Sequence, residues 1–210
     1  MKNLHKSEVL KLIRCAIKAP SGHNTQPWKF RITETGIEIH PDLDQALPIV
    51  DPNNRELYIS LGCALANLLI AANESGYKPT YKILGTYNNT HIIKVNLKES
   101  NVTGTDPLFK SIDLRQTNRS FYNDEFIHKK EMQELLTIDK EKNVNIYCFR
   151  RGEVDFETIT DYIMMGNEIQ MKNPKFKDEL VDWMRFNPKD MDEAKDGITV
   201  SYTHLTLPTN

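Results

Sequence analysis

The chain has 210 residues, 39% of them hydrophobic and 27% charged, with a formal net charge of -2. It can therefore bury a core in one or two domains, and its near-neutral charge argues against nucleic acid or a membrane surface as a partner. No run of about 18 apolar residues and no apolar segment after the N-terminus is present, so we expect neither a membrane span nor a signal peptide. The three cysteines include no CxxC pair, so we expect no metal site and a cytoplasmic protein.

Hydrophobic periodicity predicts a first helix over residues 6–18, and Pro20 stops it. Two short alternating stretches, 28–33 and 37–40, then predict strands. The residues between them, Glu34-Thr35-Gly36, have the composition of a hairpin turn.

A longer helix is predicted next. Asp51 and Pro52 have the order of an N-cap followed by a proline at the first helical position, and the helical pattern ends at Gly76. Small residues among its leucines indicate close packing on more than one side, so we expect this helix to be central. Residues 81–84 and 91–97 predict two more strands.

The polar connector 101–106 is rich in Thr, Gly and Asp, and we expect it to separate two halves, 1–105 and 106–198. Beyond it the patterns predict helices at about 128–137, 153–171 and 175–185 and a strand at 144–149. The large apolar residues of the later helices, such as Tyr162 and Met165, are expected to pack in the core or between helices, and a cofactor roof or a substrate lid is the alternative. Without a repeated βαβ rhythm, we expect an α+β fold, with a mixed or antiparallel sheet and surrounding helices around the long central helix.

The last residues differ from the rest of the chain. Residues 200–209 contain no acidic residue, lysine or arginine, and they resemble one reading frame of a transposase-type adapter used in shotgun DNA sequencing. We expect 199–210 to be a non-native tail and the natural chain to be truncated near Ile198. An apolar edge strand is the alternative for this stretch.

Residues 20–28 are the most informative segment and read Pro-Ser-Gly-His-Asn-Thr-Gln-Pro-Trp. They lead from a helix through a tight polar loop straight into a strand. Gly22 permits a positive φ, and Ser21, Asn24 and Gln26 can offer hydrogen bonds to a flat heterocycle. Taken alone, the segment also fits a capped turn whose tryptophan anchors the core.

A second segment suits a phosphate group. Arg115 and Arg119 are four residues apart, with Thr117 and Asn118 between them. Arginine is preferred for phosphate because its planar donor fork meets two phosphate oxygens at once. A solvated basic turn is the alternative.

The order of residues in 20–28 resembles the flavin-contacting loop of the nitroreductase family, which reads Pro-Ser, two variable positions, Asn, one variable position and Gln-Pro-Trp. Residues 115–119 resemble the segment with which that family holds the phosphate of FMN, although the family has it at the N-terminus. The resemblance implies a nitroreductase-like fold in which FMN is bound by Pro20, Ser21, Gly22, His23, Asn24, Gln26, Arg115, Thr117, Asn118 and Arg119.

The displaced phosphate segment is similar to a branch of the family in which two half-size units are fused. In ordinary members two identical subunits share each flavin, one supplying the loop and the other the phosphate contacts. Here one chain carries both, and 51–67 also resembles the long helix of that branch. The resemblance therefore implies a full-length monomer with an internal pseudo-dimer and one flavin per chain.

The function implied by the resemblance is an FMN-dependent oxidoreductase that passes a hydride from NAD(P)H through FMN to a small organic acceptor. Because a flavin itself carries this chemistry, no side chain is assigned as catalytic and none as a metal ligand. One alternative is a flavin-binding or storage protein without significant turnover. Another is a truncated fragment that folds poorly.

Overall fold

The computed structural model describes residues 5–85, 90–100, 106–118, 122–123, 125–137 and 144–199. The chain divides into two compact units. The first consists of residues 1–116 and 174–210, and the second of residues 117–173.

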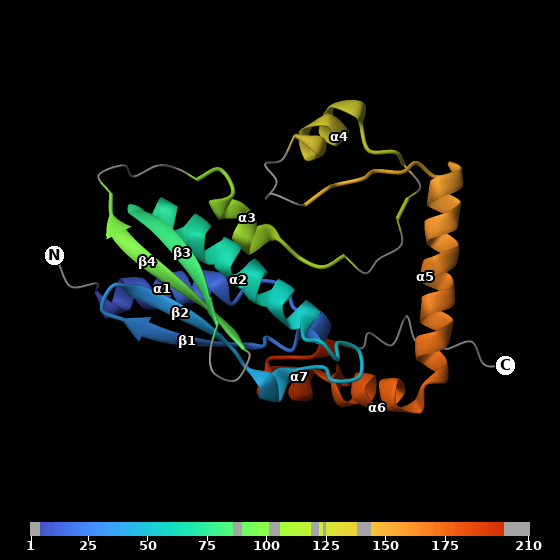
Figure 1. Ribbon diagram of the computed structural model, residues 1–210, viewed down its shortest axis with the longest axis horizontal. Coiled ribbons are helices and arrows are strands. Elements are labelled where there is room, and N and C mark those ends of the chain that lie inside the picture. Colours follow the sequence, from blue (N-terminus) through green and yellow to red (C-terminus); the bar gives the residue numbers. More distant parts are fainter. Residues whose placement is uncertain are drawn as a thin grey trace. The chain divides into compact units, whose positions relative to one another are not determined.

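The first unit is built on a four-stranded antiparallel sheet in the order β1-β2-β4-β3 (Figure 1). Its strands are β1 (Trp28–Thr33), β2 (Gly36–Pro41), β3 (Tyr77–Gly85) and β4 (His91–Glu99). The two outer strands each form a hairpin with an inner one, and the two inner strands pair with each other. Together with the helices, this antiparallel sheet confirms the predicted α+β class.

Three helices accompany the sheet in this part of the chain: α1 (Lys6–Ala16), α2 (Arg55–Glu74) and α3 (Phe109–Leu114). The spacing of the buried residues Val9, Leu12 and Ala16 places them on one face of α1, as the periodicity predicts. The predicted first helix is thus confirmed, although it ends two residues earlier than expected.

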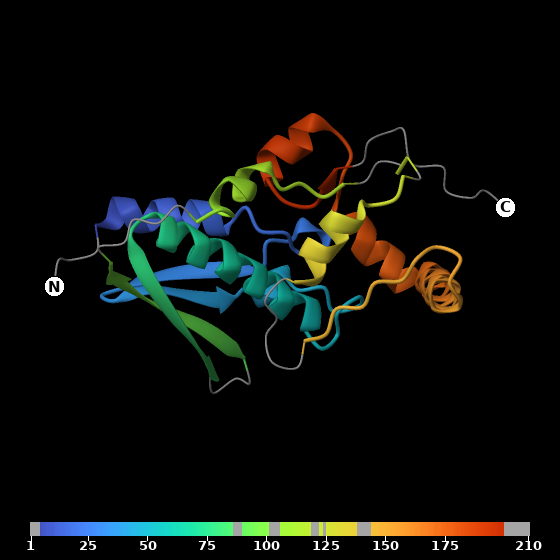
Figure 2. The ribbon, with the colours of Figure 1, turned by 90° about the horizontal axis from the view of Figure 1, so that it is seen from above.

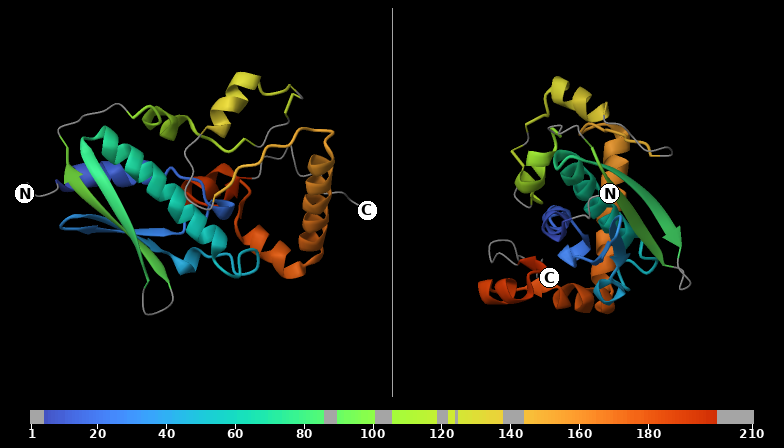
Figure 3. Two further views of the ribbon diagram at one scale, coloured as in Figure 1. Left: turned by 45° about the horizontal axis from the view of Figure 1, so that its top comes forward. Right: turned by 90° about the vertical axis from the view of Figure 1, so that its left-hand side faces the viewer.

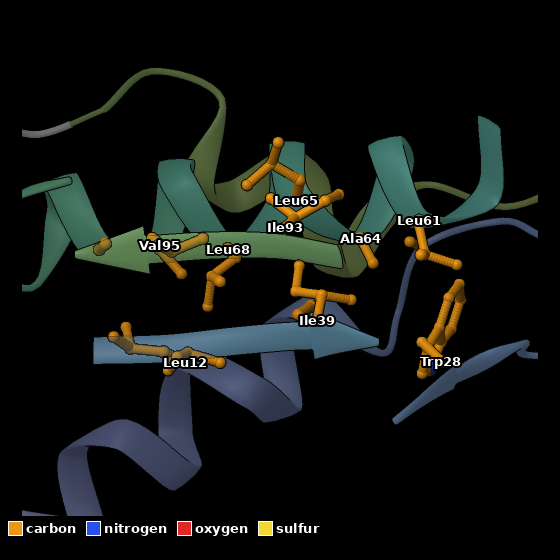
Figure 4. Packing of buried hydrophobic residues seen from close by; sticks show 14 of the residues in the cluster. Leu12, Trp28, Ile39, Leu61, Ala64, Leu65, Leu68, Ile93 and Val95 are labelled. Atoms are coloured by element: carbon orange, nitrogen blue, oxygen red, sulfur yellow. The ribbon is translucent and has the colours of Figure 1, made fainter. Parts of the chain in front are cut away.

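The core lies between these helices and one face of the sheet. Figure 4 shows Leu61, Leu65 and Leu68 of α2 beside Ile39 and Val95 from the two inner strands. The fully buried residues of the cluster come from α1, α2, β2 and β4 alike, so the long helix is central as expected. Burying each such side chain stabilises the fold by about 1.5–3 kcal/mol relative to leaving it exposed.

The start of α2 differs from the prediction. The helix begins at Arg55 rather than at Pro52, and its N-cap is Asn54, which has a left-handed conformation with φ 55°. Asp51 still supports the helix, because its buried carboxylate accepts a hydrogen bond of 2.9 Å from the backbone N–H of Leu57. The sequence therefore identified the capping carboxylate but not the extra turn between it and the helix.

By length and composition alone, α2 is also apolar enough to cross a membrane. A core helix of a folded domain meets the same criteria, and eight residues of α2 are buried within the first unit. The sequence expectation of no membrane span is therefore not changed by this helix.

The end of the first unit consists of α6 (Pro174–Asp182), β5 (Met184–Arg185), α7 (Pro188–Ala194) and β6 (Ile198–Thr199). The two short strands pair in parallel. The sequence reading did not predict α7, although Asn187 accepts a hydrogen bond of 2.9 Å from the backbone N–H of Asp190, as an N-cap does. Of the expected non-native tail 199–210, Thr199 is the last residue of β6, and residues 200–210 lie outside the described part of the chain.

The second unit contains α4 (Lys129–Leu136) and the 19-residue helix α5 (Val154–Lys172). The strand predicted at 144–149 is wrong: residues 144–150 have no regular structure, and no described strand pairs with them. The prediction that Tyr162 and Met165 pack in the core or between helices is not met in the described part of the chain, because these side chains of α5 are 70% and 57% exposed.

Candidate functional site

The polar loop predicted from the sequence lies between α1 and β1 as a compact, internally bonded turn. A short 3-10 helix, η1, spans Gly22–Asn24. The Ser21 hydroxyl accepts a hydrogen bond of 2.9 Å from the backbone N–H of Gln26, so it closes the loop from within. The next residues, Pro27 and Trp28, are buried, and this confirms that the tryptophan anchors the loop in the core.

The loop holds an unusual backbone conformation. His23, Asn24 and Gln26 have positive φ values of 47°, 55° and 51°. Such conformations cost roughly 1–3 kcal/mol each for residues other than glycine and persist only where the surroundings determine them. They occur preferentially at binding sites, so this loop is the strongest structural candidate for one among the described residues.

Gly22 plays a different part from the one expected. Its φ is not positive. A Cβ atom at this position would lie 3.1 Å from a carboxylate oxygen of Glu56 and 3.3 Å from a methyl carbon of Leu47. Glycine is therefore suited here to a close approach of the loop to α2, while the positive φ values fall on the polar residues that follow it.

Helix α2 supports the loop through hydrogen bonds. The backbone N–H of Gly22 donates to the hydroxyl of Ser60 at 3.4 Å, and that hydroxyl donates to the carbonyl oxygen of Glu56 at 2.8 Å. Thr25 is also buried at this side of the loop. Sequence reasoning missed Ser60, because nothing in the pattern of α2 indicates which of its polar residues faces the loop.

The loop is also bonded to residues near the end of the first unit. The side-chain amide of Asn24 donates to the carbonyl oxygen of Gly197 at 3.0 Å, and the backbone N–H of Gly197 donates to the carbonyl oxygen of Asn24 at 3.2 Å. The Gln26 amide donates to the carbonyl oxygen of Lys195 at 2.6 Å. Figures 2 and 3 show the red segment around α7 next to the blue turn between α1 and β1.

Arg115 lies near the beginning of the loop. Its guanidinium donates a 3.3 Å hydrogen bond to the carbonyl oxygen of Lys18, two residues before Pro20. The ammonium group of Lys18 pairs with Asp113, and this hydrogen bond raises the pKa of the lysine. Two cations and one carboxylate therefore lie next to the loop on the exposed surface.

The other predicted phosphate contacts, Thr117, Asn118 and Arg119, are not tested by the described structure. Thr117 and Asn118 are exposed and belong to the second unit, and Arg119 lies outside the described residues. Their assignment remains a prediction. Across the ranges that the structure describes, no group of three or more His, Cys, Asp or Glu side chains could hold a metal ion.

Comparison with known proteins gives a limited sequence match. A stretch of 67 residues is 39% identical to two curated proteins of Mycobacterium tuberculosis, named "Putative NAD(P)H nitroreductase MT3217" and "Putative NAD(P)H nitroreductase Rv3131". The match covers 32% of this chain and only 20% of the length of each relative. No family model matches the chain. The two names agree with the family resemblance of the loop.

Solved structures give a weak likeness. One is a protein of Parabacteroides distasonis titled "Putative NADH dehydrogenase/NAD(P)H nitroreductase", with a TM-score of 0.39 and 18% identity over 60% of this chain and 86% of that one. Another is the "Nitroreductase Family Protein" of Streptococcus pneumoniae, with a TM-score of 0.37 and 16% identity over 61% of this chain and 91% of that one. At these TM-scores the likeness carries no argument about the site.

Proposed function

We propose that the chain is the flavin-binding part of an FMN-dependent NAD(P)H oxidoreductase of the nitroreductase type. The observation that carries the proposal is the strained loop 21–26, whose residue order resembles the flavin-contacting loop of that family. The curated names attached to the 67-residue match support this class of enzyme. Because that match spans a fifth of those relatives, the activity of the whole protein belongs to the proposal.

The chemistry of the loop fits a flavin ring. A flavin presents carbonyl oxygens and ring nitrogens along one edge, and a few well-placed polar groups on a firm frame recognise such an edge. Asn24 and Gln26 each have an amide with two N–H donors and one oxygen acceptor, and one donor of each is used within the protein. The remaining donors and acceptors suit the mixed polar edge of the ring.

The positive charges beside the loop fit the phosphate of FMN. Arg115 is exposed and contacts the backbone just before the loop, and Lys18 lies next to it. An arginine fork can hold two phosphate oxygens, while a lysine contributes a point charge. We propose that Arg119, Thr117 and Asn118 complete these contacts.

The protein's own part in the reaction would be to bind and orient the cofactor. FMN supplies the hydride chemistry between NAD(P)H and a small organic acceptor when it is bound. Pro20, Ser21 and His23 would form the wall of the site, and Asn24 and Gln26 would hold the polar edge of the ring. No side chain of the described part is assigned a proton transfer.

Several broader features belong to the same proposal. The loop and the phosphate segment in one chain favour a fused pair of half-size units, 1–105 and 106–198, with one flavin and an internal pseudo-dimer. A cytoplasmic location is proposed with it.

Anaerobic mixing of the FMN-loaded protein with NADPH, and separately with NADH, tests the function. We expect the visible absorbance of the oxidised flavin to disappear and to return when a small nitroaromatic or quinone acceptor is added. Absorbance that stays unchanged with both nucleotides, in protein that demonstrably holds FMN, would contradict hydride transfer and favour flavin binding without turnover.

A further inference from the structure

We propose that the turn Lys195–Asp196–Gly197 is a positioning element of the flavin site, which fixes the backbone and the amide groups of Asn24 and Gln26. The inference rests on the proposed function and deepens it. It adds residues about 170 positions away from the loop, to which neither the sequence motif nor the comparisons assign any role.

Hydrogen bonds join the turn to the loop. Asn24 and Gly197 exchange two of them, one through the Asn24 side chain and one between backbone groups, at 3.0 and 3.2 Å. The amide of Gln26 donates to the carbonyl oxygen of Lys195 at 2.6 Å. These bonds reach two of the three loop residues that have positive φ.

The backbone of the loop is strained. A loop with three positive φ values at residues other than glycine would relax unless contacts outside it hold it in place. Within the loop, the Ser21 hydroxyl binds the backbone of Gln26 but neither amide side chain. Since a side-chain amide can rotate freely when unbonded, the carbonyl oxygens of the turn determine which way the two amides face.

The turn is itself anchored by hydrogen bonds to Trp183 and Arg185. Both the Nε and Nη2 atoms of Arg185 donate to one oxygen of Asp196, at 3.2 and 2.6 Å. The backbone N–H of Ile198 donates to the carbonyl oxygen of Trp183 at 2.8 Å. The turn therefore has its own support from Trp183 and Arg185, in addition to its bonds with the loop.

Gly197 is needed for this arrangement. Its φ is +77°, and a Cβ atom there would lie 2.5 Å from the carbonyl oxygen of Trp183 and 2.9 Å from the guanidinium carbon of Arg185. An alanine at this position would have to displace the turn or the guanidinium group. Gly152 is a matched control, because its φ is +88° but a Cβ atom there has no neighbour within 4 Å.

The test compares FMN and riboflavin binding by the unaltered chain and by Gly197→Ala, Asp196→Asn and Gly152→Ala. We expect the first two variants to weaken both flavins by the same factor of about tenfold, which corresponds to about 1.4 kcal/mol. The factors should match because the turn acts on the ring side of the site and not on the phosphate. The visible absorbance of the bound flavin should also shift, and Gly152→Ala should behave like the unaltered chain.

A readout without flavin separates this inference from the proposed function. The backbone N–H of Gln26 is bonded within the loop and should exchange with solvent faster in Asp196→Asn, which keeps the shape of the side chain. If the unaltered chain binds no flavin, the proposed function fails, whereas unchanged hydrogen exchange in Asp196→Asn overturns the positioning role by itself. Affinities that stay unchanged while thermal stability falls would make the turn merely structural. Tighter binding in the variants would show that the turn occludes the site, and this would overturn the inference.

Discussion

Glu179 offers a test of how the end of the first unit is held to its body. Its two carboxylate oxygens accept hydrogen bonds of 2.9 Å from the backbone N–H groups of Ile49 and Val50, and the residue is only 9% exposed. Hydrogen bonds to a charged group contribute about 1.5–3 kcal/mol each, and the lower value applies here because Ile49 is partly open to solvent. We therefore predict that Glu179→Ala lowers the free energy of unfolding by about 3 kcal/mol.

Urea unfolding of matched variants measures this loss. Glu179→Gln keeps one oxygen acceptor and places an NH₂ group opposite the second N–H, so about half of the loss should remain. Asp178→Ala is the control, because the neighbouring carboxylate is exposed and its removal should change stability by less than about 0.5 kcal/mol. If Glu179→Ala were no more destabilising than Asp178→Ala, the two backbone bonds would not hold α6 to the loop before α2.

Three further predictions concern other parts of the first unit. A Cβ atom at Gly36 would overlap with a backbone carbonyl of β4, so Gly36→Ala should lower the free energy of unfolding by at least about 2 kcal/mol in urea unfolding. At Gly62 in α2 a Cβ atom meets no neighbour, so Gly62→Ala should raise the free energy of unfolding by about 0.5–1 kcal/mol. Equal effects of the two substitutions would contradict the packing argument. Burial and the hydrogen bond to Glu8 raise the pKa of Tyr77 to about 12, so its contribution to stability is complete below about pH 10 and is lost as the pH rises towards 12. Between about pH 10 and 12 the free energy of unfolding of Tyr77→Phe should therefore fall less than that of the unaltered chain. Equal falls in unfolding curves measured over this interval would refute the stabilising role of the Tyr77 hydroxyl. Arg115→Ala should weaken FMN about tenfold in equilibrium titration while leaving riboflavin unchanged, and an equal loss for both flavins in folded protein would remove the phosphate role.

Local pattern was sufficient to predict much of the first unit. The apolar spacing of α1 and of α2 corresponds in each helix to a face that becomes buried. The alternation predicted for β2 does not correspond to one buried face, because its first four residues, 36–39, are all buried. Where a residue's role depends on local geometry in detail, the prediction failed. Gly22 was expected to supply a positive φ, but its φ is not positive. A glycine suits this position because a Cβ atom there would lie too close to Glu56.

The predictions that failed elsewhere depended on partners distant in sequence. Residues 144–149 have the composition of a strand, yet a strand forms only where another strand pairs with it, and the described residues provide none. The dipeptide Asp196-Gly197 is a local turn signal, but no pattern indicates that this turn binds Asn24. The polar residues 20–26 indicated where a site would lie, while only the structure shows what supports them.

Titration of the purified chain with FMN, followed by the quenching of flavin fluorescence, tests the central claim most directly. The account predicts saturable binding of one FMN per chain, weaker binding of riboflavin, and a loss of about tenfold or more for both flavins in the double variant Asn24→Ala, Gln26→Ala. Exposed-surface substitutions such as Lys130→Ala in α4 should leave both affinities unchanged. Absence of saturable binding, or binding that the double variant leaves intact, would contradict the assignment of this loop as a flavin site.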